Sequence, residues 1–109
     1  VAGVLVRGTA TITGNQFDGN GPRKGGPPNF AAWIHAGSTV TFSDNRIDRW
    51  RHALFASDAE SVRAIGNTTS RFMDTAIVVN NSKHPAHVSG NVAMSENEED
   101  EPVRVNGPQ

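Results

Sequence analysis

Four asparagines stand at the end of the same short motif along this chain. Asn15, Asn45, Asn67 and Asn91 are separated by 30, 22 and 24 residues. The positions three and five residues before each asparagine are apolar in every copy, which read ATITGN, VTFSDN, VRAIGN and AHVSGN. A repeat of roughly 20 to 50 residues, with one small unit of structure in each copy, is typical of a solenoid.

Each copy predicts two short strands joined by turns. In the clearest copy, residues 76–91, an apolar run at 77–79 precedes an Asn-Asn-Ser turn, and an alternating strand with Ala86 and Val88 follows. One such coil cannot bury its inward residues alone, so it stacks on the next and equivalent strands pair in parallel, about 4.8 Å apart. We expect each repeat asparagine to occupy a sharp turn in the left-handed conformation. Stacked asparagines then pair amide to amide as an asparagine ladder.

The composition supports strands and turns and excludes several classes of protein. The 109 residues include 11 glycines and 6 prolines, and no window has the apolar spacing of a helix. The length suffices for one domain. Without cysteine, neither a disulfide framework nor a thiolate zinc site can form. With a formal net charge of −1 and no apolar run long enough to cross a bilayer, we expect neither nucleic acid nor a membrane as partner.

The inward positions of the predicted coils define the expected core. Trp50 belongs to it because it follows Asn45 by the same number of residues as Phe72 follows Asn67. The predicted core consists of Val4, Val6, Ile12, Phe17, Ile34, Val40, Phe42, Ile47, Trp50, Leu54, Val62, Phe72, Ile77, Val79, Val88, Val103 and Val105.

The motif apolar-x-apolar-x-[Gly/Asp]-Asn-x-apolar, present as ATITGNQF, VTFSDNRI, VRAIGNTT and HVSGNVA, resembles the repeat of right-handed parallel β-helix proteins of the pectate-lyase-like superfamily. The resemblance covers nearly the whole chain. It implies an all-β fold, a short right-handed parallel β-helix of about four coils forming one domain over residues 1–109. It also favours an extracellular or periplasmic location. Such coils occur in polysaccharide lyases, glycoside hydrolases, epimerases, phage tailspikes and adhesins.

The chain departs from that family at its ends. Family members usually have more coils and a capped N-terminal end, whereas this sequence has strands at 4–6 and 103–105 and no amphipathic capping helix. Open strand edges carry unpaired donors and acceptors. We therefore expect either a homo-oligomer formed by end-to-end pairing of coils or derivation from a longer chain.

The long interval between Asn15 and Asn45 is explained by an insertion at residues 18–31, which reads DGNGPRKGGPPNFA and carries Arg23 and Lys24. Loops that project from a regular scaffold commonly carry function. The alternative is a passive loop.

Outward residues of the first strands predict a column on the surface, made of Leu5, His35, Phe55, Val78 and Arg104. In members of the resembled family that act on acidic sugars, this outer face binds the substrate through basic residues, and aromatic rings can stack on sugars. The candidate ligand-binding residues are therefore Trp33, His35, Arg49, Arg51, His52, Arg23 and Lys24. The alternative is that the basic residues only solvate the rim.

Two functions follow from these observations. The first is a β-helix module that binds a saccharide on its outer face, or a fragment of a polysaccharide-processing protein. The second is a non-catalytic module that assembles end to end. A lyase or hydrolase is the least favoured reading because Asp58, Glu60 and Asp74 form no tight cluster in the sequence. We expect no catalytic residue, no metal and no cofactor.

Overall fold

The computed structural model describes residues 2–21, 27–95 and 97–107, and this part of the chain is built from thirteen strands. Each coil contributes a first, a second and a third strand. The first strands are β1 (Ala2–Val6), β4 (Phe30–Ile34), β7 (His52–Ser57), β10 (Thr75–Asn80) and β13 (Glu101–Asn106). The second strands are β2 (Thr9–Thr13), β5 (Thr39–Ser43), β8 (Ser61–Ile65) and β11 (His87–Ser89). The third strands are β3 (Gln16–Asp18), β6 (Arg46–Asp48), β9 (Thr68–Ser70) and β12 (Val92–Met94).

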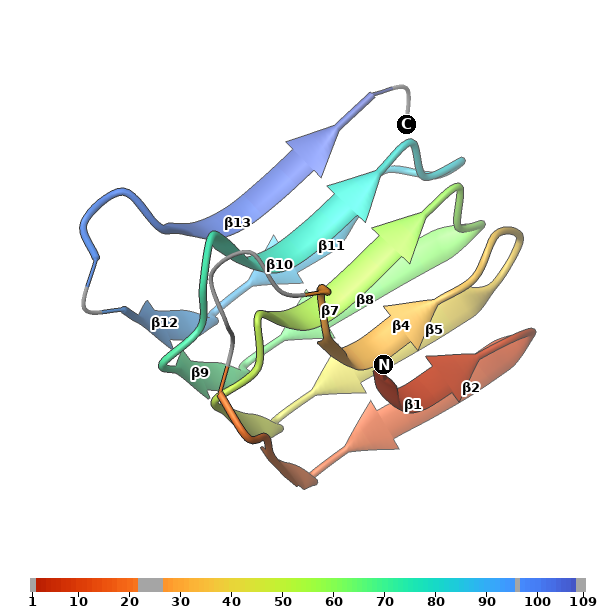
Figure 1. The fold of residues 1–109 in the computed structure, drawn as a ribbon. Helices are drawn as coiled ribbons and strands as arrows, with labels where there is room; N and C mark the ends of the chain where they lie inside the picture. Colours follow the sequence, from red (N-terminus) through yellow and green to blue (C-terminus); the bar gives the residue numbers. More distant parts are fainter. Residues whose placement is uncertain (1, 22–26, 96, 108–109) are drawn as a thin grey trace.

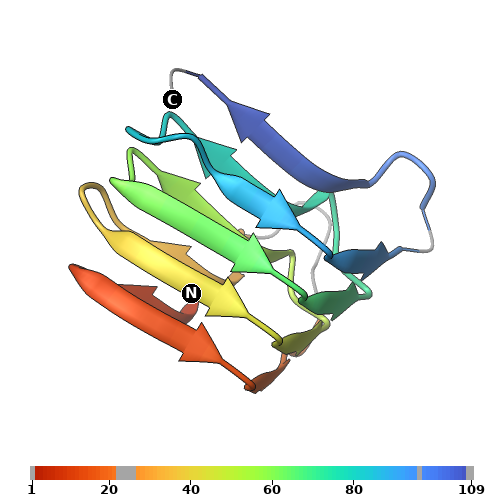
Figure 2. The same ribbon diagram turned by 180° about the vertical axis from the view of Figure 1, so that it is seen from behind.

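Equivalent strands of successive coils pair in parallel and form three sheets. The first sheet has the order β1-β4-β7-β10-β13, the second β11-β8-β5-β2 and the third β12-β9-β6-β3. The coils stack from β1 at one end to β13 at the other (Figures 1 and 2). The prediction of an all-β, parallel β-helix of about four coils is confirmed. Residues 2–21, 27–95 and 97–107 contain no helix, and hence none with the length and apolar character needed to cross a membrane.

The predicted register of the second and third strands is confirmed. Phe42 pairs with Ile12 on one side and Ala64 on the other. Ile47 pairs in the same way with Phe17 and Thr69. Alignment on the repeat asparagines therefore placed these two sheets correctly.

The predicted surface column on the first strands is wrong at two positions. Val78 is in register with Phe55 and Arg104 but is only 4% exposed, and His35 is out of register. Trp33, not His35, pairs with Leu5 and Phe55, because β4 spans Phe30–Ile34 and ends before His35. The sequence comparison aligned Ile34 with the first inward residue of the other first strands. Ala32 fills that position instead, and Ile34 pairs with Val6 and Ala56.

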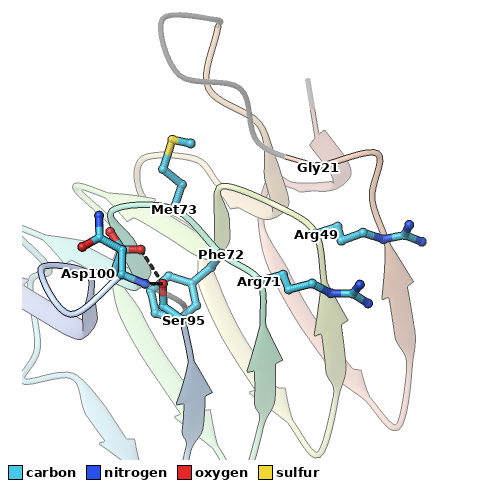
Figure 3. Close-up of a pocket in the computed structure, with 8 residues that line it drawn as sticks. Gly21, Arg49, Arg71, Phe72, Met73, Ser95 and Asp100 are labelled. Carbon is cyan, nitrogen blue, oxygen red and sulfur yellow. Dashed lines mark hydrogen bonds between the residues drawn. The ribbon is translucent and has the colours of Figure 1, made fainter.

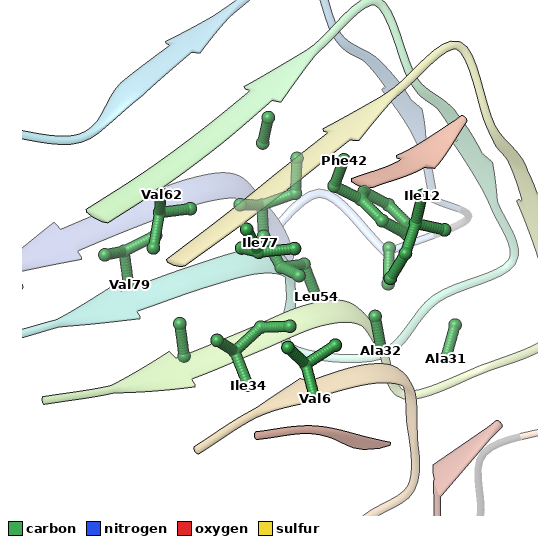
Figure 4. Close-up of a cluster of buried hydrophobic side chains, with 14 of the residues drawn as sticks. Val6, Ile12, Ala31, Ala32, Ile34, Phe42, Leu54, Val62, Ile77 and Val79 are labelled. Atoms are coloured by element: carbon green, nitrogen blue, oxygen red, sulfur yellow. The ribbon is translucent and has the colours of Figure 1, made fainter. Parts of the chain in front are cut away.

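Most of the predicted core is buried along the axis of the stack. The predicted residues that are buried are Val6, Ile12, Ile34, Val40, Phe42, Ile47, Leu54, Val62, Phe72, Ile77 and Val79. The predicted residues near the two ends, among them Val4, Phe17, Val88 and Val103, are partly buried against this cluster. Figure 4 shows branched side chains of facing strands meeting in the interior. The core therefore thins towards both ends of the stack.

The first strands break the simple alternation of inward and outward residues. Both members of the pairs Ala31–Ala32 and Ala53–Leu54 are completely buried. The residues before these pairs, Phe30 and His52, consequently share the outer face with Phe55. Sequence analysis missed the buried alanines because it counted only large apolar residues as core.

Trp50 covers the core near the β1 end of the stack. A Cβ added at Gly3 would lie 3.3 Å from Trp50 Cη2, and one added at Gly19 would lie 3.1 Å from Trp50 Cδ1. A Cβ at Gly19 would also lie 2.2 Å from the carbonyl oxygen of Arg49, a distance that real contacts do not allow. Two glycines thus make room for the indole ring, which packs against the core and is only partly exposed.

The repeat asparagines hydrogen bond from coil to coil. Asn45 Oδ1 accepts from the Asn15 main-chain N–H at 2.9 Å, and Asn45 Nδ2 donates to Asn67 Oδ1 at 3.1 Å and to the carbonyl of Ile12 at 3.0 Å. Asn67 repeats the pattern with Asn91 Oδ1, to which its Nδ2 donates at 2.9 Å. Each amide therefore links its own turn to the next coil and to the preceding one.

We expected the asparagine to adopt the left-handed conformation in this turn, but the residue before it does so instead. Gly14, Asp44, Gly66 and Gly90 have φ values of 70°, 55°, 70° and 65°. The asparagine side chain is thereby free for the hydrogen bonds between coils. Glycine or aspartate before the asparagine is consistent with the low cost of this conformation for those residues.

The insertion is slightly shorter than predicted. Asp18 still belongs to β3 and Phe30 already belongs to β4, so the connecting segment is 19–29 and not 18–31. Arg23 and Lys24 lie outside the described residues.

Replacing Asn45 by alanine is expected to lower the free energy of unfolding by about 2 to 4 kcal/mol, because it leaves buried groups of two neighbouring coils without partners. Urea denaturation would measure this loss. Asn106→Ala is a matched control, since it removes an exposed amide bond to Asn80, and we expect a change below about 0.5 kcal/mol. Equal losses in the two variants would contradict the special role of the buried asparagines.

Candidate functional site

Five rings gather on the outer face of the first sheet. We call this group the aromatic cluster; it consists of Phe30, Trp33, His35, His52 and Phe55. The centroids of Phe30 and Phe55 are 4.9 Å apart, and those of Trp33 and His35 are 4.8 Å apart. The cluster forms because β4 and β7 pair in register and both send rings outward.

The aromatic cluster has a buried part and an accessible part. Phe30 and His52 are buried, each with 8% exposure, whereas Trp33, His35 and Phe55 are partly exposed. Leu5 pairs with Trp33 and is 46% exposed, so it extends the apolar row to the next strand. The surface therefore offers apolar area supported from below by fixed rings.

His52 is the electrostatically distinct member of the aromatic cluster. Burial lowers its pKa, while the hydrogen bond between its Nδ1 and the carbonyl oxygen of Thr75 opposes this shift and the nearby Arg51 adds to it. Because the Thr75 carbonyl can only accept, Nδ1 carries the hydrogen. His52 is thus a neutral donor that ties β7 to β10.

Two side-chain atoms near the aromatic cluster have no hydrogen-bond partner within the described part of the chain. They are Nε2 of His35 and Oγ1 of Thr75, and both atoms are buried. His35 as a residue is partly exposed, so its imidazole lies at the border between the rings and solvent.

The predicted arginines do not all belong to this surface. Arg51 lies beside His52 in sequence, and its guanidinium is 3.8 Å from the carboxylate of Asp74. The main-chain N–H of Arg51 donates to Asn29 Oδ1 at 2.8 Å, which anchors the end of the insertion. On β13, Arg104 pairs with Glu101 at 2.8 Å and lowers the pKa of that carboxyl. The structure thus brings together Trp33, His35 and His52. It places the guanidinium of Arg51 beside the carboxylate of Asp74.

Arg49 lies elsewhere, at the corner where the third strands turn back to the first strands. We call the hollow there the corner pocket; its volume is about 370 Å³. The residues that line it are Gly21, Arg49, Arg71, Phe72, Met73, Ser95, Asn97 and Asp100 (Figure 3). Phe72 is 5% exposed and forms an apolar floor. Ser95 and Asp100 lie on the other side of Phe72 from the two arginines.

Asp48 holds the two arginines of the corner pocket in place. Arg71 Nε donates to Asp48 Oδ1 at 2.8 Å, and Arg49 Nε lies 3.8 Å from Asp48 Oδ2. The hydrogen bond from Arg71 is the main reason why the pKa of Asp48 is lowered. One carboxylate therefore serves two guanidinium groups.

The corner pocket was missed by sequence analysis, although the repeat contained a signal for it. Arg49, Arg71 and Ser95 each follow a repeat asparagine by four residues. Their equivalence in the stack is shown by the main-chain bonds from Arg49 to Ser70 and from Arg71 to Met94. The predicted repeat is defined by the apolar positions before each asparagine, and this polar row follows the asparagine.

The architecture defines this chain as a parallel β-helix protein. Comparison with models of protein families, with curated proteins and with solved structures finds no match. The fold class therefore rests on strand order and register, and the assignment to the pectate-lyase-like superfamily stays a prediction. Across the described ranges, no three His, Asp or Glu side chains lie close enough together to hold a metal ion.

The lowered pKa of His52 predicts that the stability of the fold depends on pH. Its folded pKa lies below the ordinary value of 6.5, so below that pH the unfolded chain binds more protons than the folded one. The free energy of unfolding is therefore expected to fall as the pH is lowered from 7.5 through 6.5 towards the folded pKa. Urea titrations across this range would measure it.

Substitution tests the origin of this dependence. His52→Gln is expected to reduce the slope of stability against pH, whereas replacement of the exposed His87 by glutamine serves as the control. An unchanged slope in His52→Gln would contradict the assignment.

Proposed function

We propose that this chain is a saccharide-binding module that uses the outer face of the first sheet. The observation that carries the proposal is the aromatic cluster, in which the partly exposed rings of Trp33 and Phe55 rest on the buried Phe30. Rigid aromatic rings provide large contact areas without loss of conformational freedom, and the apolar face of a sugar ring can pack on them.

Polar groups at the edge of the aromatic cluster complement this apolar surface. His35 is partly exposed at this edge, and an imidazole ring can donate a hydrogen bond to a hydroxyl group or accept one from it. Arg51 directly precedes β7 and Arg104 lies on β13, two strands further along the first sheet, and each is paired with a carboxylate. This local balance of charge favours neutral hydroxyls at least as much as an acidic sugar. The resemblance of the repeat to polysaccharide-processing β-helices supports the same class of ligand.

Trp33→Ala is expected to weaken the binding of oligosaccharides at least roughly tenfold, the equivalent of about 1.4 kcal/mol. Isothermal titration calorimetry with neutral oligosaccharides and oligouronates would measure the affinity and also identify the preferred class. Met94→Ala is the matched control, because Met94 is 53% exposed on the third sheet, away from the aromatic cluster. Absence of binding by the unmodified chain to any of these sugars would refute the proposal.

A second candidate function is self-association through the end strands. Within the described part of the chain, β1, β2 and β3 at one end and β13, β11 and β12 at the other have a strand neighbour on one side only. Core residues at these ends, such as Val4 and Val105, are only partly buried. Such edges favour pairing with a further strand. The ends differ in shape, since β13 extends the first sheet by one strand beyond the other two.

Thr11→Lys is expected to reduce self-association, because it places a charge on the edge strand β2. Thr41→Lys is its control, since Thr41 is the register partner of Thr11 on the interior strand β5. Light scattering over a series of protein concentrations would measure the molar mass. A constant monomeric mass at high concentration would exclude this function, and equal effects of the two lysines would show that the edge is not the contact.

A further inference from the structure

The turn between the second and third strands repeats the same hydrogen bonds from coil to coil. The main-chain N–H of one repeat asparagine donates to Oδ1 of the next asparagine along the stack, at 2.9 to 3.0 Å. The Nδ2 of that next asparagine donates back to a carbonyl of the preceding coil. These carbonyls belong to Ile12, Phe42 and Ala64. Each of these coils therefore binds an asparagine supplied by the coil that follows it.

The next members of this series lie at the open end of the second and third sheets. In the same register the next donor is the main-chain N–H of Asn91, and the next acceptor is the carbonyl of Val88, which pairs with Ala64. The neighbouring carbonyl of Ser89 accepts from the Gly66 N–H, so the polar groups of Val88 point the other way, to the open edge of β11. Within the described ranges, no residue accepts from the N–H of Asn91. The end of the stack thus presents the donor and the acceptor that bind an asparagine in the other coils.

β13 forms a wall beside this open end (Figures 1 and 2). It extends the first sheet by one strand beyond β11 and β12. Its inward residues Val103 and Val105 are only partly buried, and so are Ala86 and Val88. An extended segment placed on the edge of β11 covers these apolar side chains while its main chain pairs with Val88.

A whole second copy of the chain does not fit at this place. Only Arg7 and Gly8 separate β1 from β2, so β2 of a second copy on the β11 edge brings its β1 to the layer of β13. That layer is already filled, because β13 pairs with β10. The edge of β11 therefore suits an extended segment that has no folded strand directly before it.

We propose that the edge of β11 binds an extended segment of a partner protein, which adds to the second sheet as a parallel strand and ends in an asparagine. The segment has the pattern of the repeat, apolar-x-apolar-x-x-Asn. Its apolar side chains pack between Val88 and Val105, and its terminal amide accepts from the Asn91 N–H and donates to the Val88 carbonyl. Main-chain pairing gives affinity and the asparagine fixes the register. This inference does not depend on the saccharide proposal.

The probe is an acetylated and amidated peptide with the sequence of residues 61–70, SVRAIGNTTS, which contains β8, Asn67 and β9. Binding to the isotope-labelled chain would be followed by nuclear magnetic resonance. We expect the peptide to shift the main-chain amides of Val88, Gly90 and Asn91 and to leave those of β2 unchanged. No shift at millimolar peptide, or shifts at the β2 end only, would overturn the proposal.

The same peptide with alanine in place of Asn67 tests the role of the amide. It keeps the apolar residues and the main chain but cannot bond to the Asn91 N–H and the Val88 carbonyl. We expect it to bind roughly tenfold more weakly. Equal affinities of the two peptides would contradict recognition of the asparagine.

Two substitutions at Val88 test the edge from the side of the chain. Val88→Pro removes an N–H that points away from β8, and proline is tolerated in an edge strand. We expect this variant to bind the asparagine peptide at least roughly tenfold more weakly. Val88→Ala is the matched control, since it keeps the N–H, and we expect it to retain binding. Equal binding by the two variants would refute pairing at this edge, and the two peptides on the unmodified chain still decide the matter if Val88→Pro does not fold.

Light scattering separates this inference from self-association. The expected complex contains one chain and one peptide, whether or not the free chain associates through other edges. A mass of the free chain that exceeds the monomer and falls when the peptide is added would show that a second copy occupies the edge of β11, contrary to the inference.

Discussion

The fold depends on amide groups that satisfy two coils at once. In a parallel stack, every tight turn leaves main-chain donors and acceptors that the sheets cannot pair. Asn45 and Asn67 resolve this from inside the molecule, where both are 1% exposed. Each accepts from a main-chain N–H of the preceding coil and donates both to a carbonyl of that coil and to the asparagine of the following coil. A buried amide is costly unless all its bonds are made. The same side chain therefore fixes the turn and specifies the register of neighbouring coils.

This constraint explains which features of the chain were predictable. The asparagines set the alignment of the second and third strands, so their register followed from the sequence. The first strands are separated from the asparagines by turns of variable length, and there the alignment of His35 with Phe55 was two residues in error. Alternation alone would also have put Phe30 inside with Ala32 and Ile34. The consecutive buried alanines, which no periodicity indicates, turn Phe30 to the outer face of the first sheet, where the other rings of the aromatic cluster cover it.

The candidate sites were less predictable than the fold because they depend on contacts between residues that no single repeat contains. Trp33 and His35 were found from residue type, but the support that Phe30 gives them depends on the break in alternation. Arg49, which was grouped with Trp33 in the predicted site, lines the corner pocket. Arg49 is the first of the three residues between β6 and β7, so it lies at the corner before the first sheet begins.

The two surfaces differ in how they arise from the stack. Along the aromatic cluster, outward side chains at equivalent positions are brought within contact distance by the coil spacing, so a row of rings needs only suitable residues at successive copies. At the corner pocket Arg49 and Arg71 have a left-handed backbone conformation, which is energetically unfavourable for arginine. Packing explains neither guanidinium, because both are largely exposed. The ion pairs with Asp48 recover part of this cost, but exposed pairs contribute at most about 1 kcal/mol.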